Sequence, residues 1–163
     1  MRKAQALSIH ILDDIHRLIS ELRPTLLDDL GLVAAIRWLI DNNLEAAGIT
    51  ANFETVGRVK RLAPQLEINL FRVIQEAVSN IARHAHARNA NVSLHFKKSV
   101  IRVCVRDDGR GFDVEEAINS EDRPRGLGLL GMKERAELMN GTLDIQSRLN
   151  GGGTKIDIKI PLN

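Results

Sequence analysis

The sequence contains a single cysteine, no long apolar run and little net charge. Cys104 cannot form a disulfide within the chain and has no neighbouring cysteine for a metal site, which predicts a reducing, cytoplasmic setting. Because no apolar run reaches membrane-spanning length, we expect no membrane contact from this segment. The 23 basic and 21 acidic side chains are interspersed, so no basic stripe indicates a nucleic-acid partner.

The composition is that of one globular domain. Of the 163 residues, 44% are hydrophobic and 27% are charged, which is enough to bury one sizeable core. No internal repeat or low-complexity tract is visible, and the one weak boundary lies near Pro24. We therefore expect a short first part, residues 1–27, and a main domain, residues 28–163.

The N-terminal segment has the pattern of a helix that packs against another helix. Its apolar and small side chains recur at steps of four and three: Ala4, Ser8, Ile11, Ile15, Leu18 and Leu22. Pro24 then disfavours helical geometry at Arg23. The Asp28 and Asp29 carboxylates are candidate N-caps for a second helix, which the pattern extends through Trp38 to about Ala47.

The rest of the chain predicts strands and helices in a mixed order. Period-two or apolar runs predict strands over Ile49–Val56, Asn91–Lys97, Ile101–Asp107, Thr142–Arg148 and Thr154–Ile160. Helical spacing predicts helices over Pro64–Ala85 and from about Leu129 to Met139. These elements predict an α+β fold, a two-layer α/β sandwich whose mixed, mostly antiparallel sheet carries helices on one face.

Four polar side chains share one flank of the predicted helix that starts at Pro64. Glu76 and Asn80 are four residues apart, and Arg83 and His84 follow at three and four residues further on. An amide oxygen and a carboxylate suit a magnesium ion, and basic groups suit phosphate charge. The alternative is an ordinary solvated helix flank.

Asp107 ends a predicted strand and shares the parity of Ile101, Val103 and Val105. A carboxylate on the covered face needs a dedicated donor, and the exocyclic amine of adenine is one candidate. The neighbouring Asp108 has the opposite parity, so we expect it to face solvent or to cap a turn. The alternative for the Asp-Gly sequence is a tight turn.

Two glycine-rich stretches follow. Gly126–Gly131 spells the dinucleotide-binding fingerprint, but the polar Glu121–Arg125 segment precedes it instead of a parallel strand, so that interpretation fails. Glycines before a helix that opens near Leu129 instead predict a phosphate cradle and lid. The second stretch, Gly151–Gly153, is either a hairpin turn or a lead into Thr154, whose inward parity places its hydroxyl beside Asp107 if their strands are neighbours.

Four motifs, taken in order, resemble the N, G1, G2 and G3 boxes of the histidine-kinase, gyrase, Hsp90 and MutL ATPase superfamily. They are Gln75–Asn80, Asp107–Phe112, Gly126–Leu129 and Gly151–Thr154. Three further segments look like the sensor histidine kinases that pair with NarL-type response regulators, namely Leu22–Leu32, Arg83–Ala85 and Gly128–Ala136. The resemblance covers essentially the whole chain.

The resemblance implies a Bergerat ATP-binding fold that uses ATP and Mg²⁺. In it Asn80 ligates the metal, Glu76 supports a metal-bound or catalytic water, and Asp107 reads adenine. The lid and nucleotide contacts then fall on Gly109, Gly111, Gly126, Leu127, Gly128 and Leu129, with supporting contacts from Arg83, His84, Lys133 and Thr154. Residues 28–163 correspond to the ATP-binding catalytic domain, which places the chain in the cytoplasm or in the cytoplasmic part of a membrane-bound sensor.

The same resemblance makes residues 1–27 the second helix of a truncated dimerisation domain. Neither His10 nor His16 is followed by the acidic residue that marks the subfamily's phosphoacceptor, so we expect the acceptor histidine to lie outside this sequence. The implied partners are an acceptor-histidine domain of the same kinase family, a second copy in the full-length protein and a NarL-type response regulator. The alternatives are an anti-sigma-factor-like serine kinase and a non-catalytic partner-binding module.

Overall fold

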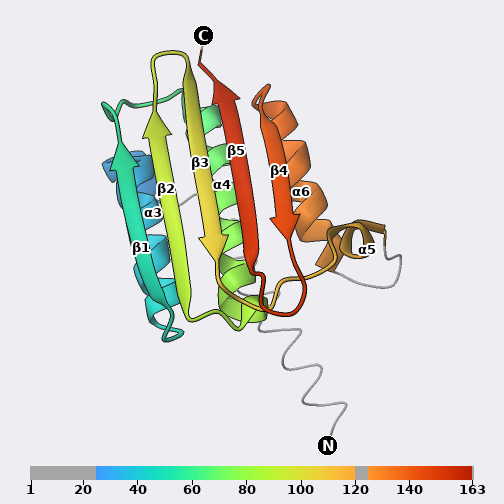
Figure 1. Cartoon of the computed structure of the whole chain (residues 1–163). Coiled ribbons are helices and arrows are strands. Elements are labelled where there is room, and N and C mark those ends of the chain that lie inside the picture. The colour runs from blue at the N-terminus through green and yellow to red at the C-terminus, as the bar shows by residue number, and fades with distance from the viewer. Residues whose placement is uncertain (1–24, 120–124, 163) are drawn as a thin grey trace, which may run out of the picture.

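The computed structural model describes residues 25–119 and 125–162, which form a five-stranded sheet with helices packed on one face (Figure 1). The strands lie in the order β1-β2-β3-β5-β4. They are β1 Thr50–Val56, β2 Asn89–Phe96, β3 Val100–Asp107, β4 Thr142–Ser147 and β5 Thr154–Pro161. β1 runs parallel to β2 and the other three pairs are antiparallel, which confirms the predicted mixed, mostly antiparallel sheet.

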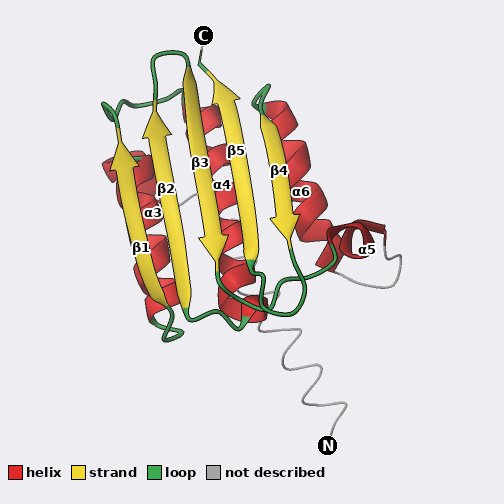
Figure 2. Ribbon diagram, viewed as in Figure 1, coloured by secondary structure: helices red, strands yellow, loops and turns green. Residues whose placement is uncertain are grey.

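The helices form the second layer, behind the sheet in Figure 2. They are α2 Thr25–Leu30, α3 Leu32–Ile40, α4 Pro64–Asn80, α5 Val114–Asn119 and α6 Arg125–Leu138. α3 and α4 each end in a π-helical turn, η1 Asp41–Glu45 and η2 Ile81–Ala85. α4 packs between α3 and α6, and α5 lies beside β4 and the start of α6.

Period-two alternation decides which face of the sheet is covered. Along β3 the buried side chains are Ile101, Val103, Val105 and Asp107, and the intervening ones are more exposed. The inward side chains pack against buried residues of α4 such as Leu70, Phe71 and Ile74. Burial of each side chain of this size stabilises the fold by about 1.5–3 kcal/mol. Burial of the inward-facing side chains is therefore the main interaction that holds the helices against the sheet.

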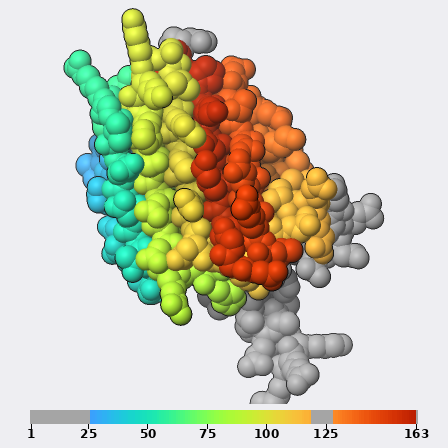
Figure 3. Space-filling view, in the orientation of Figure 1, coloured from blue at the N-terminus to red at the C-terminus, as the bar shows by residue number. Residues whose placement is uncertain are grey.

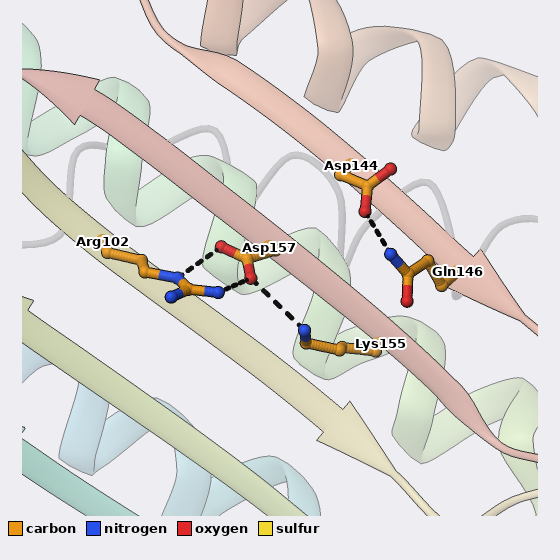
Figure 4. A network of polar contacts seen from close by, with 5 residues as sticks. All are labelled: Arg102, Asp144, Gln146, Lys155 and Asp157. Atoms are coloured by element: carbon orange, nitrogen blue, oxygen red, sulfur yellow. Dashed lines mark hydrogen bonds and ion pairs between the residues drawn. The ribbon is translucent and has the colours of Figure 1, made fainter.

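The opposite face of the sheet, which faces the viewer in Figure 3, carries polar side chains such as Ser93, Arg102 and Asp157. There Asp157 accepts hydrogen bonds from the Arg102 guanidinium, and Lys155 Nζ lies 3.4 Å from Asp157 Oδ2 (Figure 4). The Arg102 hydrogen bond holds the pKa of Asp157 below its ordinary value. Nearby, Gln146 donates to Asp144 at 2.6 Å.

The start of the second predicted helix differs from the expectation. Asp28 and Asp29 lie inside α2, so the prediction that they cap a helix beginning there was wrong. The break comes at Gly31, whose φ of 84° begins α3 at Leu32. The break depends on a residue distant in the sequence. Arg61 lies against Gly31 and donates hydrogen bonds to the carbonyls of Leu27 and Asp28 at 3.2 and 2.7 Å, which gives these carbonyls partners near the end of α2.

Two helices downstream also differ from the sequence pattern. α5 was not among the helices expected from the sequence. A signal for it was present, because the Asp113 carboxylate accepts the Glu116 N–H at 2.9 Å, three residues on. α6 begins at Arg125, so the predicted start near Leu129 was wrong. β2 and β3 form an antiparallel hairpin, and β4 and β5 form a second one, which is the hairpin alternative for Gly151–Gly153.

Some expectations fall on residues outside the described ranges. The predicted helix over Ala4–Leu22 lies there, as does most of the polar Glu121–Arg125 segment. The division at residue 27 therefore stays a prediction. Among the helices that the structure describes, none is long and apolar enough to span a membrane.

Candidate functional site

Asp107 places a carboxylate on the covered face at the end of β3. Its residue is only 5% exposed, which confirms the inward parity. The Gly109 N–H donates to Asp107 Oδ1 at 2.8 Å. Burial raises the pKa of Asp107, and the backbone N–H groups of Gly109 and Thr154 oppose that rise. The fold thus holds a partly desolvated acceptor in a defined orientation.

Asp108 is exposed and ties two chain segments together. Its carboxylate accepts the Arg88 N–H at 2.8 Å, the Asn89 N–H at 2.9 Å and the Asn89 side-chain amide at 2.7 Å. The hydrogen bonds from Asn89 lower the pKa of Asp108. The expectation that Asp108 faces solvent or caps a turn is confirmed, because it closes the start of β2 onto the end of β3.

The glycines around Asp107 permit close backbone packing. A Cβ on Gly109 would overlap the Ala85 carbonyl, and a Cβ on Gly111, which has a φ of 65°, would overlap the Arg148 carbonyl. The Gly153 N–H donates to the Gly109 carbonyl at 2.9 Å. The loop after β3 is therefore packed against the end of η2 and against the loop before β5, with no room for side chains between them.

The predicted polar flank of α4 is present beside α6. Glu76 and Asn80 are half-buried. Gly128 lies directly against Glu76, because a Cβ there would overlap Glu76 Oε1. Arg83 is exposed and donates to the Ser79 hydroxyl at 2.5 Å, and His84 is half-buried. The structure thus brings Glu76 to the G2 segment.

The remaining predicted residues divide between surface and core. Lys133 is exposed on α6, whereas Leu129 is 7% exposed and packs in the hydrophobic core. Gly126 and Leu127 lie in the first turn of α6. Thr154 is half-buried and directly opposite Asp107, so the two strands are neighbours as the expectation required.

Sequence reasoning missed Ser147 at the end of β4. Its Oγ accepts the Phe112 N–H at 3.0 Å, donates to the Gly153 carbonyl at 3.1 Å and lies 2.9 Å from Thr154 Oγ1. A signal for it existed, because Ser147 has the parity of Leu143 and Ile145. A hydroxyl of inward parity at a strand end is the same pattern that singled out Asp107.

The donor set fits a nucleotide with a magnesium ion. The Asn80 amide and the Glu76 carboxylate carry hard oxygen atoms, and Mg²⁺ is commonly held by one or two such side chains together with substrate phosphates and water. Within the described ranges there is no group of three or more His, Cys, Asp and Glu side chains placed to hold a metal ion.

Comparison with known proteins identifies the family. Residues 65–163 match the model of the histidine kinase-, DNA gyrase B- and HSP90-like ATPases. The chain is 42% identical to the signal transduction histidine-protein kinase/phosphatase DegS of Bacillus subtilis over 144 residues, which is 86% of this chain and 37% of DegS. It is 36% identical to the oxygen sensor histidine kinase NreB of Staphylococcus carnosus over 161 residues, covering 99% of this chain and 45% of NreB.

Solved structures share the fold. The chain superposes with a TM-score of 0.64 on the histidine kinase domain of the blue-light activated kinase of Erythrobacter litoralis, at 21% identity over 80% of this chain and 61% of that one. Full-length ShkA in complex with AMPPNP gives a TM-score of 0.65 at 20% identity, over 80% of this chain and 29% of ShkA.

The chain therefore belongs to the family of histidine kinase-, DNA gyrase B- and HSP90-like ATPases, and it is an ATP-binding domain of the sensor histidine kinase type. The predicted Bergerat fold is confirmed. The chain spans less than half the length of the DegS and NreB relatives that it matches.

Proposed function

We propose that this domain binds Mg-ATP and transfers the γ-phosphoryl group to a histidine of a phosphoacceptor domain in a two-component sensor kinase. The observation that carries the proposal is the Asp107 carboxylate, buried at the end of β3 and oriented by the Gly109 N–H. A carboxylate has two oxygens that can each accept more than one hydrogen bond, so Asp107 can also accept from an adenine amine. The family membership supports ATP as the nucleotide.

The other end of the nucleotide would lie along the α4 flank. Bound Mg²⁺ would neutralise phosphate charge there. The Asn80 amide oxygen is our proposed metal ligand, and Glu76, which lies against Gly128 of α6, would hold a water or the accepting imidazole. Arg83, His84 and Lys133 are our proposed supporting contacts to the phosphates, and the start of α6, with Gly126 and Leu127, would border them.

The transfer is a displacement at the γ-phosphorus. A nitrogen of the acceptor imidazole forms the new N–P bond, the bond from the γ-phosphorus to the β,γ-bridging oxygen breaks, and ADP leaves. The proton of the imidazole passes to a base or to solvent. The domain contributes chiefly by positioning the nucleotide and by neutralising charge.

The names of the relatives support the signalling context. DegS is described as a histidine-protein kinase/phosphatase and NreB as an oxygen sensor histidine kinase. We propose that the full-length protein acts as a homodimer and passes its phosphoryl group to a response regulator of the NarL type. The acceptor histidine is proposed to lie outside this sequence.

Nucleotide binding measured with and without Mg²⁺ tests the pocket. We expect micromolar binding of ATP and an altered metal dependence in Asn80→Asp. We expect ATP binding to be lost in Asp107→Asn, because the neutral amide oxygen is a weaker acceptor than a carboxylate and the amide NH2 only donates. Unchanged ATP affinity in Asp107→Asn would refute the adenine assignment.

Phosphoryl transfer is tested with γ-labelled ATP and a separately supplied acceptor-histidine domain. Label that is acid-labile and appears on that domain supports the proposal. Acid-stable label on a protein serine would establish the serine-kinase alternative. Absence of any ATP binding would establish the non-catalytic module.

A further inference from the structure

Asp107, Thr154 and Ser147 form one row across three neighbouring strands. Asp107 pairs with Thr154 between β3 and β5, and Thr154 pairs with Ser147 between β5 and β4 (strands in Figure 1). Directly paired residues point to the same side of a sheet. The three side chains therefore share the covered face at the end of the sheet where the glycine loops begin.

The contacts of Ser147 determine which way its proton points. A backbone N–H can only donate, so the 3.0 Å contact from Phe112 uses a lone pair of Ser147 Oγ. A backbone carbonyl can only accept, so the 3.1 Å contact to Gly153 takes the single hydroxyl proton. The 2.9 Å contact with Thr154 Oγ1 is then one in which Thr154 donates and Ser147 accepts.

This arrangement makes the neighbouring site a pair of acceptors. Because the Thr154 hydroxyl proton points at Ser147, the Thr154 oxygen can only accept hydrogen bonds from a ligand that lies next to Asp107. The ionised Asp107 carboxylate also only accepts. A purine with a 6-amino group supplies donors to such a pair, directly or through water, whereas a 6-oxo purine places a third acceptor against it.

We propose that Ser147 is a positioning residue for nucleotide specificity: by accepting the Thr154 proton it makes the site select 6-aminopurine nucleotides over 6-oxopurine nucleotides. The inference rests on the proposed function, in which Asp107 reads the base. Ser147 would thus affect the choice between 6-aminopurine and 6-oxopurine nucleotides without touching the nucleotide. Ser147 also joins the loop after β3 to the loop before β5, so the same hydroxyl couples base selection to loop geometry.

The test compares dissociation constants for ATP and ITP, which differ only in the groups at positions 6 and 1 of the base. In Ser147→Ala we expect the ATP preference to fall by about threefold to tenfold, the range of one net hydrogen bond. Ser147→Thr keeps the hydroxyl and should retain the preference. Gln146→Ala, one residue away on the opposite face of the sheet, is the matched control, and its preference for ATP over ITP should equal that of the parent chain.

A double-mutant comparison separates a specific from a merely structural role. If Ser147 acts through Thr154, Ser147→Ala has no further effect on the ATP-to-ITP ratio in a Thr154→Val background. Independent, additive effects of the two changes would overturn the inference, as would an unchanged ratio in Ser147→Ala. Asp107→Asn distinguishes failure of the proposed function from failure of the role of Ser147. If Asp107→Asn abolishes ATP binding while Ser147→Ala leaves the ATP-to-ITP affinity ratio unchanged, only the role of Ser147 is wrong.

Discussion

Two adjacent aspartates at the end of β3 experience opposite environments. Asp107 is buried on the covered face, and burial raises its pKa. Asp108 is exposed, and three donors from Arg88 and Asn89 lower its pKa. The Asp107 carboxylate is the proposed acceptor for adenine, and the Asp108 carboxylate fixes the end of β3 to the start of β2. The strand parity of neighbouring residues is what separates the two roles.

The two carboxylates are predicted to affect stability with opposite signs. The pKa of Asp107 is raised in the fold, so its contribution is greatest below the unfolded pKa and is lost as pH rises through the folded pKa. Asp107→Asn should therefore leave the free energy of unfolding at pH 7 unchanged or higher. The pKa of Asp108 is lowered, so its contribution is present above the unfolded pKa and lost as pH falls through the folded pKa.

Asp108→Asn should consequently destabilise the domain at pH 7, and the loss should shrink as pH falls through the folded pKa of Asp108. Urea unfolding of both variants and the parent chain at several pH values measures this. A loss of more than about 1 kcal/mol at pH 7 in Asp107→Asn, the size of one net hydrogen bond, would contradict the prediction.

Gly111 is predicted to be essential for folding of the site loops. It has a φ of 65°, and a Cβ there would overlap the Arg148 carbonyl. Gly111→Ala should lower the free energy of unfolding by about 2–4 kcal/mol, from backbone strain and overpacking together. Gly151 has a φ of 88° with nothing near its Cβ position, so Gly151→Ala is the control and should lose only about 1 kcal/mol. Equal losses in urea unfolding would contradict this account.

At the scale of elements, α2 is held by the buried Leu27 and by a side chain from the loop before α4. Arg61 donates to the last carbonyls of α2, and its Nη1 lies 3.8 Å from Oε2 of the buried Glu67 at the start of α4. Glu67 also accepts the Leu62 N–H at 3.0 Å. A cavity of about 160 Å³ beside this contact is lined by apolar residues that include Leu30, Val59 and Phe96. Arg61 thus fixes the direction in which the chain leaves α2.

Arg61→Ala is predicted to loosen the C-terminal end of α2, while Leu27 stays packed in the core. The half-exposed guanidinium makes charge-assisted bonds whose net contribution is about 1 kcal/mol, and we expect a loss of that size in the free energy of unfolding. Hydrogen exchange of the amides in 25–34 should become faster. Arg58→Ala, an exposed arginine in the same loop, is the control. If exchange in that segment did not change in Arg61→Ala, the proposed role of Arg61 would be wrong.

For the whole molecule, the site lies at one end of the sheet. The loops after β3 and before β5 are bonded to each other and to the end of η2, and α6 meets α4 through Gly128. β1 and η1 lie at the other edge of the sheet, away from β4 and α6 (Figure 1). Nucleotide binding should therefore stabilise the domain unevenly.

Mg-ATP at one hundred times its dissociation constant should raise the free energy of unfolding by about 2.7 kcal/mol, because it binds only the folded state. Hydrogen exchange should slow chiefly in 107–112, 126–133 and 148–154, and little in β1. Thermal unfolding and exchange with and without a non-hydrolysable ATP analogue measure this. Uniform protection that includes β1 would contradict a localised site, and Asp107→Asn should remove the stabilisation.

The features that depend on local periodicity could be predicted from the amino-acid sequence. Period two turned Asp107 and Thr154 inward and Asp108 outward, helical spacing put Glu76 and Asn80 on one flank, and four ordered motifs identified the ATPase family. These follow from backbone geometry, which a stretch of a few residues already specifies. Asp113 and Glu116 carried the signal of α5 in the same local way.

Contacts between residues far apart in the chain depend on the assembled fold. The strand order places β5 between β3 and β4, and this alone sets Ser147 beside Thr154 and both beside Asp107. The end of α2 depends on Arg61, 33 positions away from Asp28, and Gly128 meets Glu76 only because α4 packs against α6. Many strands and helices share a similar local pattern, so local sequence does not specify which of them pair or pack together. The free energy of the assembled core determines the partners.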